Sequence, residues 1–280
     1  VSATLAAQPI SSAYGSVDIS SITALWSANG NPEGTLYEAE VSTDNFSTLN
    51  FSSATRNNSA LFGSGGAGNA LTPNSTHYFR VRAINYDGVA TNLTSLGSTS
   101  TLAALPLSDN FSNVEQSSIT AVWLANGNPQ GTLYISQIST DNFVTVNFSS
   151  QTKNSSVLFG SGGAGNALGL NTTYYFRVAA RNNNGLQTGY ISLGSTGTLS
   201  AQPLSSAYGS VDISSITAVW LANGNPQGTL YQAQVSTDSF ATLNFSSRTY
   251  NTSVLFGTGG AGDPLSANTT HYFRAQAINH

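Results

Sequence analysis

The sequence of 280 residues contains no cysteine and no methionine. Without cysteine it can form no disulfide, no thiolate metal site and no cysteine nucleophile. Charge is also scarce, because only 7% of the residues are charged and Lys153 is the single lysine. A chain with so few cations and a net charge of −4 lacks the basic surface that phosphate binding requires, so we expect no nucleic-acid partner.

Long apolar runs are missing as well, and the sequence therefore predicts no membrane-spanning helix. The chain begins Val-Ser-Ala, with neither an initiator methionine nor a signal-peptide pattern. We interpret it as a mature or excised portion of something longer. Disorder is not expected, because 39% of the residues are hydrophobic and can form a core.

The dominant feature of the sequence is a repeat of 97 residues. It is clearest in the tryptophans and in one long stretch, at Trp26, Trp123 and Trp220 and at 71–85, 168–182 and 265–279. A unit of this length can bury a core of its own, unlike the shorter units of solenoids. The predicted domains are 1–101, 102–198 and 199–280. Three full periods would need 291 residues, so the third repeat ends 11 residues short and lacks most of its last strand.

Apolar residues alternate with polar ones along each repeat, which is typical of β-strands with one buried face. Tyr37, Ala39 and Val41 are expected to point inward, with Glu38 and Glu40 outward. The strands predicted for the first repeat lie at 22–26, 36–41, 49–51, 61–62, 77–83 and 93–102. Since no segment has helical periodicity, the sequence predicts an all-β chain of three tandem β-sandwiches.

Several residues of this pattern are found in a known family. They are the Ser-Ile-Thr-Ala-Leu-Trp26 strand, the inward Tyr37, and a Leu-x-Pro-x-x-x-aromatic-x-Phe-x-Val-x-Ala-x-Asn run that ends at Asn85. The chain thereby resembles fibronectin type III domains, above all those repeated in bacterial secreted and surface proteins. The resemblance implies the sandwich fold and an extracellular location, but no particular function, because this fold serves many roles.

The resemblance also implies an inward tyrosine that hydrogen-bonds to nearby backbone at the start of one strand. Tyr174 matches that position, whereas His77 and His271 replace it in the other two repeats. We interpret both histidines as structural, each donating one such bond. The Arg-Gly-Asp tripeptide that binds cells in this family is absent.

Other chemical motifs do not point to catalysis. Gly63 to Gly68 has the glycine spacing of a dinucleotide-binding loop, but a strand is expected after it instead of a helix, so we interpret it as a mobile surface loop. His77, His271 and His280 are too few and too far apart for a metal site. Asp44, Asp141 and Asp238 recur in Ser-Thr-Asp-x-Phe and are interpreted as turn caps. We predict no enzyme activity, metal or cofactor.

The tripeptide Asn-x-Ser/Thr, which accepts N-linked glycans, occurs twelve times. Nine of these sites recur in phase, at Asn50, Asn57, Asn74, Asn147, Asn154, Asn171, Asn244, Asn251 and Asn268. Three do not, at Asn45, Asn92 and Asn110. Asn74 and its equivalents are expected on an exposed corner. Glycosylation and a merely hydrophilic surface copied by duplication both remain open.

The domains follow one another with almost no linker, which predicts a rod on the order of 100 Å long. Residues 1–5 are in phase with 98–102, so the N-terminal segment of one copy could complete the third domain of another by strand addition. The predicted function is a structural subunit of an extracellular, glycosylated fibre or stalk, with copies of itself and covalent glycans as partners. The alternative is a spacer or carbohydrate-binding accessory module, for which Tyr14, Phe111 and Tyr208 are candidate contacts.

Overall fold

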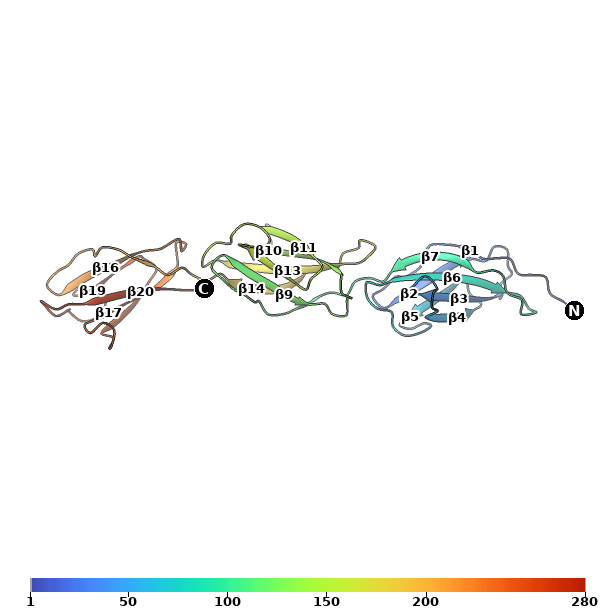
Figure 1. Ribbon diagram of the computed structural model, residues 1–280, viewed down its shortest axis with the longest axis horizontal. Helices are drawn as coiled ribbons and strands as arrows, with labels where there is room; N and C mark the ends of the chain where they lie inside the picture. Colours follow the sequence, from blue (N-terminus) through green and yellow to red (C-terminus); the bar gives the residue numbers. More distant parts are fainter. Residues whose placement is uncertain (1, 280) are drawn as a thin grey trace.

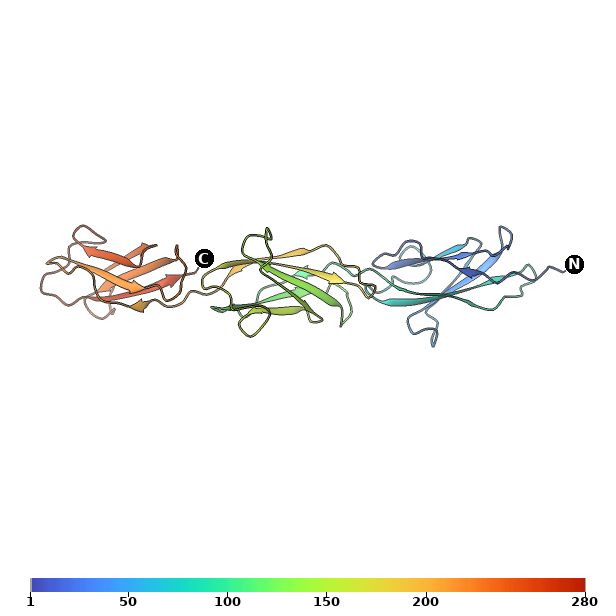
Figure 2. The ribbon, with the colours of Figure 1, turned by 90° about the horizontal axis from the view of Figure 1, so that it is seen from above.

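The computed structural model describes residues 2–279, which form twenty β-strands and no helix. Three two-sheet units follow one another end to end, as two perpendicular views show (Figures 1 and 2). The units together form an extended rod of separate sandwiches. No helix in this described part is long and apolar enough to cross a membrane.

The first sandwich pairs a three-stranded and a four-stranded antiparallel sheet. In spatial order the sheets are β1 (Ile10–Ser11), β2 (Ser21–Ser27) and β5 (Ser59–Gly63), and β4 (Phe51–Thr55), β3 (Leu36–Ser42), β6 (Thr76–Ile84) and β7 (Thr94–Ser100). The edge strand β1 follows Pro9, which lacks the N–H that a central strand would need. The seven strands form the fibronectin type III-like sandwich that the resemblance implied.

The second sandwich repeats this order. Its sheets are β8 (Leu107–Ser108), β9 (Ser118–Leu124) and β12 (Ser156–Gly160), and β11 (Phe148–Thr152), β10 (Leu133–Ser139), β13 (Thr173–Arg181) and β14 (Ile191–Gly197). In the third they are β15 (Leu204–Ser205), β16 (Ser215–Leu221) and β19 (Ser253–Gly257), and β18 (Phe245–Thr249), β17 (Leu230–Ser236) and β20 (Tyr272–Ile278). No strand between residues 2 and 279 takes the place of β7 or β14 there, so β20 is an edge strand. The predicted fold class is confirmed, including the missing last strand.

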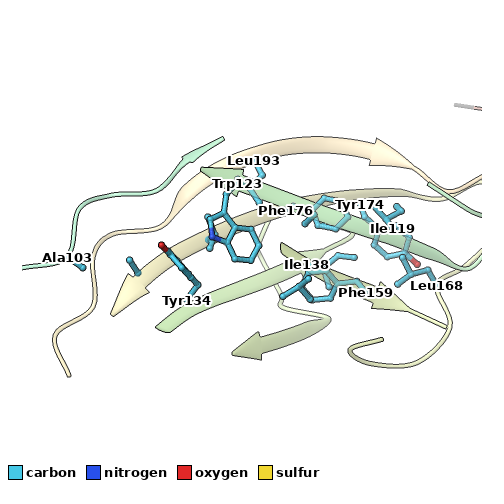
Figure 3. Packing of buried hydrophobic residues seen from close by; sticks show 14 residues of the cluster. Ala103, Ile119, Trp123, Tyr134, Ile138, Phe159, Leu168, Tyr174, Phe176 and Leu193 are labelled. Atoms are coloured by element: carbon cyan, nitrogen blue, oxygen red, sulfur yellow. The ribbon is translucent and has the colours of Figure 1, made fainter. Parts of the chain in front are cut away.

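Each sandwich closes over its own tryptophan. In the second, Trp123 is 1% exposed and its ring centroid lies 5.5 Å from that of Tyr134 (Figure 3). Phe159 and Phe176 pack with tilted rings, 5.9 Å apart at their centroids, further along the same core. Trp26 and Trp220 occupy the matching places. Three separate clusters of buried side chains mean that each unit has the core of an independent domain.

Two details of the predicted strands are wrong. The strand expected at 49–51 begins only at Phe51. Glu40, expected to face outward, is only 6% exposed. It lies beneath Arg80, whose Nε donates to its Oε2 at 2.5 Å. An ion pair across neighbouring strands thus covers a carboxylate that alternation alone assigns to the surface.

The glycine-rich loop at 63–68 lies on the surface, as expected, with Ser64, Gly65, Gly66 and Gly68 exposed, but its backbone packs closely on its neighbours. It turns back on β5, where the Ala67 N–H donates to the carbonyl of Leu61 at 2.8 Å. A Cβ placed on Gly66 would lie 2.2 Å from that same carbonyl oxygen, and one on Gly68 would lie 2.3 Å from the Phe51 ring. The glycines permit close packing, and the strand β6 after them excludes the dinucleotide-binding unit.

A groove of about 640 Å³ runs beside β20 in the third sandwich. It is lined by Tyr208, Trp220 and Phe273, among others. In the other two sandwiches Leu96 of β7 and Leu193 of β14 fill this place and are each 5% exposed. The groove therefore corresponds to the place that the last strand occupies in the other two sandwiches.

Replacing Trp123 by alanine should destabilise the second domain by about 3–5 kcal/mol, because it empties the centre of a closed core. Urea unfolding followed by domain-resolved hydrogen exchange measures this loss. The adjacent Leu124 is 51% exposed, and Leu124→Ala should change stability by less than about 0.5 kcal/mol. Equal losses in the two variants would contradict the assignment of the core.

Candidate functional site

The junction between the first two sandwiches centres on the Asn74 side chain. Its Nδ2 donates to Thr132 Oγ1 of the second sandwich at 2.8 Å, and its Oδ1 accepts from the Asn183 N–H at 2.7 Å. Asn183 Nδ2 in turn donates to the Asn74 carbonyl at 3.2 Å. Asn74 is 3% exposed and Thr132 2%. Three hydrogen bonds, two of them to Asn74's own side chain, thus join the two domains.

Further amides of the second sandwich hold the end of the first one's last strand. Asn182 Nδ2 donates to the Thr101 carbonyl at 3.1 Å, and Asn184 Nδ2 donates to Thr99 Oγ1 at 2.9 Å. Thr101 is itself fixed in the first sandwich, since its Oγ1 donates to the Thr72 carbonyl at 2.7 Å. The strand end is therefore shared by both domains.

The short connection after Thr101 is clamped by Asn128. Its Oδ1 accepts from the Ala104 N–H and its Nδ2 donates to the Ala104 carbonyl, both at 2.8 Å, so that one side chain replaces a neighbouring strand. Asn225 forms the same two hydrogen bonds with Ala201 in the connection that precedes the third sandwich. A linker held on both of its polar groups leaves little room for bending.

The second junction repeats the asparagine–threonine contact of the first. Asn171, 1% exposed, donates through Nδ2 to Thr229 Oγ1 at 3.1 Å. A Cβ placed on Gly224 would lie 3.1 Å from Leu170 Cδ1, which shows how closely the two domains approach. Elsewhere this junction differs from the first, since the Ser200 N–H donates to Asn279 Oδ1 at 2.7 Å. The 97-residue period thus repeats the asparagine–threonine contact and the linker clamp as well as the fold.

The expected exposure of the corner asparagines is wrong for Asn74 and Asn171, because the next domain covers both. Asn268, their equivalent in the third sandwich, is exposed. The other candidates are exposed as expected, at Asn45, Asn50, Asn57, Asn92, Asn110, Asn147, Asn154, Asn244 and Asn251. The Asn50 amide is also ordered, since its Oδ1 accepts from the Thr43 N–H at 2.7 Å. Glycosylation of these sites stays a prediction.

The Ser-Thr-Asp-x-Phe loops cap turns, as predicted. Asp44 Oδ1 accepts from Ser42 Oγ at 2.7 Å and from the Thr48 N–H at 2.9 Å. These hydrogen bonds, the one from the Thr48 backbone first, lower the pKa of Asp44 to about 2. The same loop holds Phe46 at a φ of 65°, with the Arg80 guanidinium 4.0 Å above its ring. A carboxylate held ionised in this way is a poor general acid.

The histidines form no site together. His77 is 3% exposed, and its Nε2 has no hydrogen-bond partner within residues 2–279, so the bond expected there is absent. Its counterpart Tyr174 does form the corner bond, accepting from the Gly169 N–H at 2.9 Å. Nδ1 of His271 lies 3.0 Å from the Thr269 carbonyl, and His280 lies outside the described residues. The described residues contain no group of three His, Asp or Glu side chains placed to hold a metal.

The aromatic residues considered for carbohydrate contact do not form an exposed row. Tyr14 packs on Phe79 with ring centroids 5.4 Å apart, and burial raises its pKa to about 12. Phe111 packs on Phe176 at 4.8 Å. Tyr208 is 55% exposed only because the last strand is missing beside it. The inward interpretation of these residues is the one that the packing supports.

Sequence reasoning missed the residues that build the junctions. No motif in the sequence points to Asn128, Asn225, Thr132 or Asn183. All recur at the 97-residue period or stand beside residues that do. The available signal was an asparagine retained at one loop position in every repeat, which a simple turn does not demand.

No family model matches the chain, and no curated protein matches it. Among solved structures it is similar to the FN1-FN3 domains of chicken CNTN1, with 14% identity, a TM-score of 0.30, and coverage of 97% of this chain and 93% of that chain. It is also similar to a segment of two fibronectin type III domains from chicken tenascin. There the identity is 12%, the TM-score 0.45, and the coverage 69% of this chain and 100% of that chain.

The buried His77 should make the first domain sensitive to mild acid. Burial lowers its pKa below the ordinary 6.5, so the unfolded chain takes up a proton before the folded one does. The free energy of unfolding of the first domain is then constant at a pH above 6.5. Below it, this free energy falls as the pH decreases, by at most about 1.4 kcal/mol per pH unit. Hydrogen exchange of first-domain amides at about pH 7.5 and about pH 5 measures the change.

The matched variants exchange the two corner residues. His77→Tyr should abolish the pH dependence of the first domain in this range, because tyrosine stays neutral. Tyr174→His should give the second domain the same pH dependence, while the first domain keeps its own. An unchanged pH profile in His77→Tyr would show that another group is responsible.

Asn74→Gly should loosen the first junction. It removes both side-chain bonds while keeping the left-handed backbone, which has a φ of 46°. The loss of about 1–3 kcal/mol across the interface should appear in small-angle X-ray scattering as a shorter maximum dimension. Asn113→Gly, at an exposed residue with an equivalent φ of 47°, is the control. Two identical scattering curves would contradict the role of Asn74.

Proposed function

We propose that this chain is a structural subunit of an extracellular fibre or surface stalk of the bacterial secreted type, built from glycosylated copies assembled head to tail. The observation that carries the proposal is the repeated junction, in which a buried asparagine bridges two domains and a second one clamps the linker. Such joints favour a fixed length over bending, and length is what a stalk supplies.

Within residues 2–279 the recurrent aspartates are held in their own turns, which supports a mechanical role. Asp44, Asp141 and Asp238 all have their pKa lowered to about 2 by hydrogen bonds within their own turns. A buried histidine without a partner and a tyrosine packed inward offer no pair of acid and base within reach of each other. We therefore assign no catalytic activity to the chain.

The distribution of exposed asparagines supports a glycan coat. Asn57, Asn154 and Asn251 recur at the same exposed turn of each domain, so that glycans there would be spaced regularly along the rod. Polar glycans would shield a surface that carries little charge of its own.

Electron microscopy and glycopeptide mapping of native material test the proposal. We expect filaments, with glycans at exposed sites such as Asn57 and none at Asn74 or Asn171, whose amides are buried between domains. Discrete particles without filaments would favour the spacer or accessory-module alternative. An intact mass equal to that of the bare chain would remove the glycans from the proposal.

A further inference from the structure

The outer end of the third sandwich has the same construction as the two faces that form junctions, but it lies open. Asn268 has a φ of 51°, compared with 46° for Asn74 and 44° for Asn171, so the backbone is already in the junction conformation. Within the described residues, the covering domain is missing at this end, and so are the last strand and the residues that follow it in the other two sandwiches. Apolar side chains at this end are exposed as well, Val211 by 63% and Ile213 by 84%.

A groove of about 310 Å³ opens at this end face, lined by Val211, Ile213, Leu265, Asn268, Thr269 and His271, among others. In the first domain the corresponding place holds the chain at Thr101 and Leu102. The Asn74 N–H donates to the Leu102 carbonyl at 3.0 Å there, and the Ser75 N–H donates to Thr101 Oγ1 at 3.0 Å. The groove is therefore shaped for a Thr-Leu pair in extended conformation.

The N-terminal end of the chain presents that pair in the required arrangement. Thr4 and Leu5 are in phase with Thr101 and Leu102. Asn85 Nδ2 donates to the Thr4 carbonyl at 3.1 Å, as Asn182 does to Thr101. Leu5 is 76% exposed. The segment Ser2–Leu5 is thus already held against its own domain as the strand end is held at an internal junction.

The partner for the Asn268 side chain is present on the same end of the molecule. Thr35 is in phase with Thr132 and Thr229, the threonines that accept from Asn74 and Asn171. Its hydroxyl has the same orientation, since Oγ1 donates to the Pro32 carbonyl at 2.7 Å and Thr132 Oγ1 does so to Pro129 at 2.8 Å. The two ends of one chain are complementary surfaces.

We propose that the end face of the third domain docks the N-terminal end of a second copy of this chain, with Ser2–Leu5 in the groove and Asn268 Nδ2 donating to Thr35 Oγ1. The inference rests on the proposed head-to-tail fibre and names its contacts. The contact joins two different faces of the chain. Every assembly therefore keeps one free face at each end, and association continues as a filament.

The same nitrogen of Asn268 is the atom that an N-linked glycan would use. In that reaction Nδ2 loses a proton and forms a bond to the first carbon of a diphosphate-activated sugar. The bond between that carbon and the diphosphate breaks, and the diphosphate leaves. A substituted Nδ2 with a glycan on it does not fit against Thr35. Glycosylation at Asn268 and docking therefore exclude each other, so that a glycan there ends the filament.

The test uses the unglycosylated 280-residue chain in sedimentation velocity over a range of concentrations. Wild type should form a concentration-dependent series of oligomers. Asn268→Gly should weaken association roughly tenfold, and a chain lacking residues 1–5 should not self-associate. Asn251→Gly, an exposed asparagine of the same domain, is the control and should behave as wild type. Tryptophan fluorescence verifies that each variant is folded.

Mixing experiments test the polarity. A chain that lacks only residues 1–5 keeps its Asn268 face, and Asn268→Gly keeps its N-terminal end. At concentrations where each variant alone is monomeric, an equal mixture should therefore form pairs and nothing larger. A wild type that stays monomeric, or Asn268→Gly chains that associate like wild type, would overturn the inference. Filaments in native material would in either case leave the proposed fibre standing, with other contacts between copies.

Discussion

The polar groups of the backbone at strand ends are the constraint on which this rod depends. A strand that leaves one sheet and enters the next domain has N–H and C=O groups without a ladder partner, and these must be paired when they are covered. Asparagine carries a donor and an acceptor on one short side chain and can stand in for a neighbouring peptide. Asn128 does this for both groups of Ala104, and Asn182 does it for the Thr101 carbonyl. The domains can therefore follow one another without a spacer.

This solution uses almost no charge. Within residues 2–279 the two ion pairs, Arg80 with Glu40 and Arg82 with Glu38, both lie in the first domain. In the second, Arg177 keeps its place but donates to the neutral Gln137 at 2.8 Å. Interactions between neutral groups are little affected by ionic strength, unlike surface ion pairs. A rod joined by amides and hydroxyls therefore depends little on the ionic strength around it.

The sequence predicts the strands far better than the junctions. Strands such as β2 and β6 were found because burial of one face imposes a period of two on their residues. The strand predicted at 49–51 starts too early. Asn50 Oδ1 accepts from the Thr43 N–H, and regular strand pairing begins only at Phe51. The contact between Asn74 and Thr132 could not be predicted. Periodicity shows which residues are equivalent, but it does not show which residues of neighbouring repeats touch.

The same limit explains why one tripeptide has two environments. Asn74-Ser-Thr76 and Asn57-Asn-Ser59 are equally good glycan acceptors as sequences, yet the first is buried and the second exposed. At the first site both polar residues serve the junction, since Asn74 bonds to Thr132 and Asn183 Nδ2 lies 3.4 Å from Thr76 Oγ1. Packing accounts for that tripeptide without any glycan. The Asn-x-Thr tripeptide at this corner is buried in a junction when another domain follows and is exposed when none does. The local sequence does not show whether a domain packs there.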